Sequence, residues 1–173
     1  MIKQDLSENQ AKLIYLAIGS NLGNKIQNIE KTKSELLRYD IKIIKCSKYF
    51  ESDSWPDPLN PKFNNIVIEV KTNLAPLQLL NICKLIERKL GRKKSKKNSP
   101  RSCDIDIIDY DHKILNFSDE NLILPHPRMT DRNFVLLPLF GINKCWKHPK
   151  SGKNIAKLLN ALPIKDLRSI KQI

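Results

Sequence analysis

The chain contains no apolar run near the ~20 residues that a membrane-spanning helix needs. Its first residues, Met1 to Asp5, lack the apolar core of a signal peptide. Its four cysteines form no Cys-x-x-Cys pair, and its three histidines show no ligand spacing with them. These absences argue against a membrane protein and against a zinc site. We therefore expect a protein of the reducing cytoplasm that does not bind membranes.

Acidic residues are few relative to basic ones, with 18 Asp and Glu against 31 Lys and Arg, which gives a formal net charge of +13. This excess suits three kinds of partner, namely nucleic acid, a membrane surface or a small polyanion such as ATP, although part of it is a solvated lysine face. The 173 residues contain no internal repeat and no linker. We predict a flexible N-terminal extension over residues 1–12 and a single domain over residues 13–173.

Hydrophobic periodicity predicts strands over residues 13–19, 41–50 and 64–71, with an irregular, proline-bearing segment over 51–62. A first helix begins at about Lys25, and its expected apolar face consists of Ile26, Ile29, Leu36 and Leu37. A second helix begins at Pro76 and ends at Gly91, with an apolar stripe made of Leu79, Cys83, Ile86 and Leu90.

A fourth strand contains Asp104, so the element order is β-α-β-β-α-β. This order predicts the α+β class and a ferredoxin-like core, in which helices cover one face of an antiparallel sheet. A C-terminal extension follows, with a turn at Pro125 to Pro127, an apolar segment over 134–140 and a helix over 154–162.

Two carboxylates two residues apart in the apolar run Cys103-Asp104-Ile105-Asp106-Ile107 are the strongest functional signal. Alternate side chains of a strand share a face, so Asp104 and Asp106 point the same way while the isoleucines enter the core. Two like charges at a partly buried site need compensation, which a divalent cation supplies. The other interpretation is an edge strand with solvated acids, although such edges more often carry lysine. Asp109 and Asp111 are predicted to be turn residues.

Cationic segments flank the acidic strand on both sides. Upstream lies the basic loop 92–97, followed by Arg101, and Arg92 and Arg101 are the strongest candidates because a guanidinium binds phosphate in a bidentate way. Downstream, His126 is followed by Arg128 and Arg132, which makes a second phosphate-facing cluster plausible. The segment Gly19 to Gly23 is not a Walker motif, since no Gly-Lys-Ser/Thr follows, and is predicted to be a turn.

Aromatic residues bracket the proline-bearing segment and the third strand. Such residues usually belong to a core, but Trp55, Phe63 and Phe134 could also sandwich a flat heterocycle, with the Asn65 amide reading its edge.

These residues together carry a resemblance. The segments 15–23, 60–65, 79–92, 100–107 and 124–129, with Arg132, Phe134 and Pro138, make the chain resemble the 6-hydroxymethyl-7,8-dihydropterin pyrophosphokinase family over nearly its whole length. The resemblance implies a ferredoxin-like fold. It also implies transfer of pyrophosphate from ATP to the pterin hydroxymethyl group, which gives AMP and the pterin diphosphate in folate biosynthesis.

The resemblance implies the roles of individual residues as well. Two Mg²⁺ ions would be held by Asp104 and Asp106, and these two residues would share the catalytic role with Arg92, Arg101 and His126. ATP would lie among Leu80, Lys84, Glu87, Arg92, Lys94, Lys97, Arg101, Ile107, His126 and Arg132. The pterin would contact Ser52, Asp53, Trp55, Phe63, Asn65 and Phe134. A monomer without a nucleic-acid partner is expected.

The chain departs from the family pattern in the basic loop. Asn98 stands where the family commonly has tryptophan, so the cover of the pterin differs, and Trp55 is a candidate to replace it. Lys94 and Lys97 replace arginines, which keeps the charge but loses the bidentate fork. We expect the loops 51–62 and 92–101 to become ordered when substrates bind.

Two other functions stay open from the sequence. A ferredoxin-like nucleic-acid-binding module would account for the positive charge, but its first strand offers only Tyr15 for base stacking and no RNP1-like string exists. A catalytically inactive paralogue would account for Asn98 and the two lysines. An assay for AMP formation separates both from the pyrophosphokinase.

Overall fold

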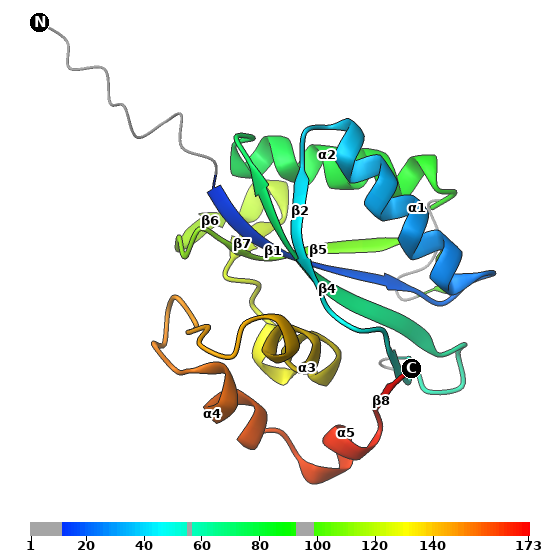
Figure 1. Ribbon diagram of the computed structural model, residues 1–173, viewed down its shortest axis with the longest axis vertical. Coiled ribbons are helices and arrows are strands. Elements are labelled where there is room, and N and C mark those ends of the chain that lie inside the picture. Colours follow the sequence, from blue (N-terminus) through cyan, green and yellow to red (C-terminus); the bar gives the residue numbers. More distant parts are fainter. Residues whose placement is uncertain (1–11, 55–56, 93–98) are drawn as a thin grey trace, which may run out of the picture.

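The computed structural model describes residues 12–54, 57–92 and 99–173 (Figure 1). Its main elements are β1 (Lys12–Ser20), α1 (Lys25–Arg38), β2 (Lys42–Cys46), β3 (Phe50–Ser52), β4 (Phe63–Thr72), α2 (Pro76–Lys89), β5 (Asp104–Tyr110), β6 (Leu115–Phe117), β7 (Leu122–Leu124), α3 (Asn133–Ile142), α4 (Ile155–Asn160), α5 (Ile164–Arg168) and β8 (Lys171–Gln172). Trp55, Lys94, Lys97 and Asn98, which were predicted to lie at or near the substrates, lie outside the described residues.

The main sheet has the strand order β5-β1-β4-β3-β8, β2 also pairs with β4, and the pairings are antiparallel. This confirms the predicted ferredoxin-like core. The predicted second strand is wrong in one respect, because it is divided into β2 and β3. At the break, Ser47 Oγ accepts the backbone N–H of Val67 at 3.0 Å, a bond that a regular ladder would give to a carbonyl. β1 begins at Lys12, which was expected to belong to the extension.

Helices α1 and α2 cover one face of the sheet (Figure 1). The apolar stripe of α2 is confirmed, since Leu79, Cys83 and Ile86 are buried. The prediction for α1 is half wrong: Ile29 and Leu36 are buried, whereas Ile26 and Leu37 are exposed. The buried side of α1 runs through Ile29, Thr32 and Leu36, at helical spacing, so Ile26 and Leu37 fall outside its contact with the sheet.

The C-terminal extension covers the opposite face of the sheet. Helices α3 and α4 pack there around a second core that includes Tyr15, Val67, Leu136 and Trp146. The predicted C-terminal helix is confirmed as α4, with Asn154 as its N-cap. No helix in the described part of the chain is long and apolar enough to cross a membrane.

A β-bulge in β5 changes the direction of one acidic side chain. Tyr15 pairs with Asp109 and Leu16 with Ile107, so Ile108 is an extra residue. Asp109 thereby turns toward α3 and α4, where Trp146 Nε1 donates to its Oδ2 at 2.8 Å. The prediction that Asp109 is a turn residue is therefore wrong, because β5 continues through the bulge to Tyr110 and keeps Asp109 within the strand. Asp111 does lie in the turn after β5, at φ 54°.

Candidate functional site

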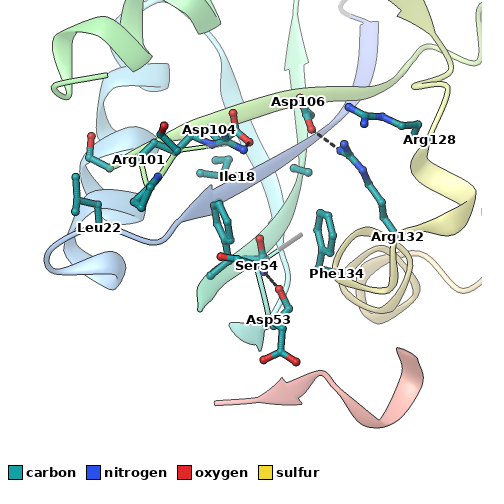
Figure 2. Close-up of a pocket in the computed structure, with 18 of the residues that line it drawn as sticks. Ile18, Leu22, Asp53, Ser54, Arg101, Asp104, Asp106, Arg128, Arg132 and Phe134 are labelled. Atoms are coloured by element: carbon teal, nitrogen blue, oxygen red, sulfur yellow. Dashed lines mark hydrogen bonds and ion pairs between the residues drawn. The ribbon is translucent and has the colours of Figure 1, made fainter. Parts of the chain in front are cut away.

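A cavity of about 1260 Å³ opens on the sheet face that α3 partly covers (Figure 2). Strands β1, β3, β4 and β5 form its floor, and α2, α3 and α5 add walls. Twelve of the predicted site residues line it: Ser52, Asp53, Phe63, Asn65, Lys84, Glu87, Arg92, Arg101, Asp104, Asp106, Arg132 and Phe134. Folding therefore brings together residues that lie more than eighty positions apart in the sequence.

The remaining predicted residues that the structure describes line a smaller adjoining pocket of about 290 Å³. This pocket contains Leu80, Ile107 and His126, and it shares Asp106 and Arg128 with the large cavity. The acidic pair thus stands where the two spaces meet.

Both predicted carboxylates point the same way from β5, while Ile105 and Ile107 are buried on the other face, as alternation predicts. Asp104 Oδ1 receives Arg92 Nη1 at 2.8 Å, and its Oδ2 lies 3.0 Å from Arg101 Nη2. Asp106 Oδ2 receives Arg132 Nη1 at 2.8 Å (Figure 2). Burial raises the pKa of Asp104, and the nearby Asp106 charge raises it further. When no ligand is bound, the three arginines offset the cost of keeping the two neighbouring carboxylates charged.

Glu87, on α2, is bonded to the backbone of the strand that carries the acidic pair. Its Oε1 accepts the backbone N–H of Ile105 at 2.8 Å, and the carboxylate also pairs with Arg92. Burial raises the pKa of Glu87 to about 7. Arg92 therefore bridges Glu87 and Asp104, and Glu87 fixes both the strand and the cation beside it.

His126 follows the cis Leu124-Pro125 peptide and faces Asp106, with Nε2 3.8 Å from Oδ2. Its Nδ1 accepts the backbone N–H of Arg128 at 3.2 Å. In the neutral ring this bond assigns the proton to Nε2, on the side of Asp106. Burial lowers the pKa of His126. The ring can therefore act as a neutral donor toward an anion bound beside Asp106.

The aromatic end of the cavity contains Phe63 from β4 and Phe134 from α3. The guanidinium of Arg101 lies 5.5 Å from the centroid of Phe63, and that of Arg132 lies 5.5 Å from the centroid of Phe134. Asn65 Nδ2 donates to Ser52 Oγ at 2.9 Å, which fixes the amide at the floor. Two arginines thus connect the acidic pair to an aromatic slot with an amide at its edge.

Sequence reasoning missed Asn21, which connects the loops around the cavity. Its Oδ1 accepts the backbone N–H of Arg101 at 2.8 Å, and its Nδ2 donates to Pro61 O at 3.1 Å and to Ser54 Oγ at 3.3 Å. The side chain lies in the predicted turn after β1. An asparagine in a short segment between two glycines is typical of a turn, so its residue type alone does not reveal this role.

The acidic pair fits a magnesium site in its chemistry. Among the described residues no cluster of three or more His, Cys, Asp and Glu could hold a metal alone. Mg²⁺ usually takes only one or two carboxylates and completes its shell with phosphate oxygens and water. Asp104 and Asp106 offer that number, next to cations suited to phosphate.

Comparison with known proteins agrees with this geometry. The family model described as 7,8-dihydro-6-hydroxymethylpterin-pyrophosphokinase (HPPK) matches residues 15–144. Folic acid synthesis protein fol1 of Pneumocystis carinii is 39% identical over 163 residues, which are 94% of this chain and 22% of that protein. The 2-amino-4-hydroxy-6-hydroxymethyldihydropteridine pyrophosphokinase of Bacillus subtilis is 35% identical over 128 residues, which are 73% of this chain and 75% of that protein.

Among solved structures, an HPPK-DHPS chain of Plasmodium falciparum has a TM-score of 0.71 at 18% identity, over 95% of this chain and 48% of that chain, and so shares the fold. This chain spans only 22% of the Pneumocystis protein and 21% of its Schizosaccharomyces pombe counterpart. The extent of the family match and the identity to the bacterial enzyme show that the chain belongs to the 7,8-dihydro-6-hydroxymethylpterin-pyrophosphokinase family.

Proposed function

We propose that the chain transfers pyrophosphate from ATP to the hydroxymethyl group of 6-hydroxymethyl-7,8-dihydropterin in a Mg²⁺-dependent reaction. The products are AMP and the pterin diphosphate, and the reaction belongs to folate biosynthesis. The observation that carries the proposal is the position of the Asp104–Asp106 pair, between a small pocket and an aromatic slot, with Arg92, Arg101 and Arg132 around it.

Each substrate has a matching part of the site. The nucleotide base fits the small pocket of Leu80 and Ile107, and its phosphates extend past His126 toward the arginines of the large cavity. The pterin ring fits between Phe63 and Phe134, where Asn65 offers an amide to its polar edge. The hydroxymethyl group then lies on the side of the acidic pair.

Two Mg²⁺ ions would be held by Asp104 and Asp106, and when bound they would neutralise charge on the phosphate oxygens. The residues of the chain do the positioning, which carries most of phosphoryl transfer. As the triphosphate binds, Arg92, Arg101 and Arg132 exchange carboxylate partners for phosphate oxygens. His126 donates from Nε2 to an anionic oxygen. No protein nucleophile is needed. The substrate hydroxyl oxygen bonds to the β-phosphorus, and the bond between that phosphorus and the bridging oxygen breaks. AMP leaves with the bridging oxygen, and the hydroxyl proton is released to water.

The decisive experiment measures AMP formation from ATP and 6-hydroxymethyl-7,8-dihydropterin with Mg²⁺. We expect AMP only when both substrates and the metal are present. Folded protein that binds both substrates but forms no AMP would instead be the inactive paralogue.

Apart from the positive charge, no observation on the described residues favours the nucleic-acid module. Tyr15, the one first-strand aromatic, is buried under α3 and donates its hydroxyl to Glu69 Oε2 at 2.8 Å, so it offers no stacking surface. The expected monomeric state, the cytoplasmic location and the single domain stay predictions.

A further inference from the structure

The C-terminal segment lines the large cavity although it lies beyond the family match, which ends at residue 144. Helix α5 contributes Lys165 and Asp166 to the wall, and its C-cap residue Ser169 also lines the cavity. None of these three residues was predicted to belong to the site.

Helix α5 is fixed to the base of the aromatic slot through Asn133. This residue directly precedes Phe134, and its Nδ2 donates to Asp166 O and to Ser169 Oγ, the latter at 3.2 Å. Ser169 Oγ in turn donates to Asp166 O at 2.9 Å. Asn133 is buried, so α5 and the Phe134 ring are held in one arrangement.

Strand β8 fixes the opposite side of the slot. It pairs with β3 in the register Glu51 to Lys171, and Ile173 N donates to Tyr49 O at 2.9 Å. The next residue of β3 is Ser52, which receives the Asn65 amide. In Figure 2, Asp53 points toward this C-terminal segment. The same short segment therefore supports both the amide and the ring of the slot.

The segment belongs to the aromatic end and not to the nucleotide end. In the described part of the chain, the smaller pocket is lined by residues up to Arg128 and by none of the C-terminal segment. Lys165, on α5, and Ser169, its C-cap, stand one helical turn apart, so both line the same side of the cavity.

We infer that residues 164–172 form a substrate-positioning wall of the pterin slot, in which α5 contacts the substrate and β8 holds Ser52 in place for Asn65. The inference rests on the proposed function for the identity of the heterocycle. It assigns part of the pterin affinity to a segment outside the family match.

The first test compares Lys165→Ala/Ser169→Ala with Arg168→Ala in the full chain. Arg168 is an exposed cation on the same helix that does not line the cavity, so it controls for loss of charge and of helix propensity. The double variant removes Lys165 from the cavity and the Ser169 hydroxyl that holds Asn133. We expect KM for the pterin to rise about fivefold, while KM for ATP stays within about twofold. Arg168→Ala should match the parent.

The second test compares Lys171→Pro with Lys171→Ala. Proline has no N–H and cannot continue the pairing of β8 with β3, whereas alanine can. We expect only the proline variant to bind the pterin more weakly. Thermal unfolding shows whether the proline variant is folded.

Unchanged pterin KM in the double variant, or an equal rise in KM for ATP, overturns the inference. Failure of the proposed function is separate, since the parent itself would then form no AMP. In that case pterin Kd, measured by the fluorescence of the pterin, takes the place of KM, and equal Kd values for parent and double variant overturn the inference.

Discussion

The two ends of β5 carry the same residue type toward the same side of the sheet, yet they do different things. Asp104 and Asp106 border an open cavity and are held by arginine side chains. Asp109 lies under the segment that connects α3 to α4, where its carboxylate accepts the Trp146 Nε1–H at 2.8 Å, and it also accepts the backbone N–H of His112, in the turn after β5, at 3.0 Å. Burial raises the pKa of both Asp104 and Asp109.

The difference lies in the layer above the strand. Where the helical layer is closed, the carboxylate is satisfied by donors that belong to the fold and cannot leave. Where the layer ends, the carboxylates are paired with long guanidinium side chains that can take other partners. One strand thus serves stability at one end and chemistry at the other.

Asp106→Ala should have the largest effect of the substitutions that test this contrast, and the effect should be on activity. It removes one of the two carboxylates that would hold the metal, so we expect kcat to fall at least about a thousandfold. The free energy of unfolding should stay within about 1 kcal/mol, because Asp106 is only partly buried. The AMP assay and urea unfolding measure the two quantities. Asp119→Ala, an exposed carboxylate outside both pockets, is the control, and near-normal turnover of Asp106→Ala would refute the assignment.

Asp109→Ala should show the opposite pattern. It leaves the Trp146 N–H buried without an acceptor, which costs about 2 to 3 kcal/mol of unfolding free energy. Activity per folded molecule should stay near that of the parent. Urea unfolding followed by tryptophan fluorescence measures the loss, and Asp109→Asn, which keeps an acceptor oxygen, should lose less. If Asp109→Ala has the stability of the parent but no activity, the contrast between Asp109 and the acidic pair is wrong.

Glu87→Gln should change how stability depends on pH. The pKa of Glu87 is about 7 in the folded protein against 4.5 for the ordinary group, so the folded state holds the proton more tightly. The stability of the parent should therefore fall, relative to the Gln variant, as pH rises from about 4.5 to 7, by of the order of 2 kcal/mol, and level off above. Urea unfolding at pH 5, 6, 7 and 8 tests this. A constant difference between the two proteins contradicts it.

Gly19→Ala should have the smallest effect, confined to the pterin. A Cβ there would lie 3.0 Å from Asn65 Oδ1 and 3.3 Å from Phe63 Cδ1. Asn65 cannot move freely because Ser52 holds its amide, so we expect pterin KM to rise about tenfold with ATP KM unchanged. The control is Gly141→Ala, since a Cβ at Gly141 meets nothing within 4 Å. If Gly19→Ala keeps the pterin KM of the parent, then Asn65 and Phe63 shift to make room for the added methyl group, and the prediction is wrong.

The sequence was informative where one local rule sufficed. Alternation along β5 predicted the common direction of Asp104 and Asp106, and helical spacing predicted the buried face of α2. Prediction failed at Asp109, because a bulge is a property of two paired strands. It failed at Asn21 and Ser169 as well, since their roles depend on chain segments that meet only in the fold. Trp55 and Asn98 lie outside the described residues, so the cover of the pterin stays a prediction.

The hydrogen bonds of Asn21 couple the binding of the two substrates. One buried amide is bonded to Arg101 on one side of the cavity and to Ser54 and Pro61 on the other. A ligand that moves the backbone at Arg101 therefore also acts on the amide that holds the opposite loop. Thermodynamic linkage then requires the effect to be mutual: whatever free energy the nucleotide contributes to pterin affinity, the pterin returns to nucleotide affinity.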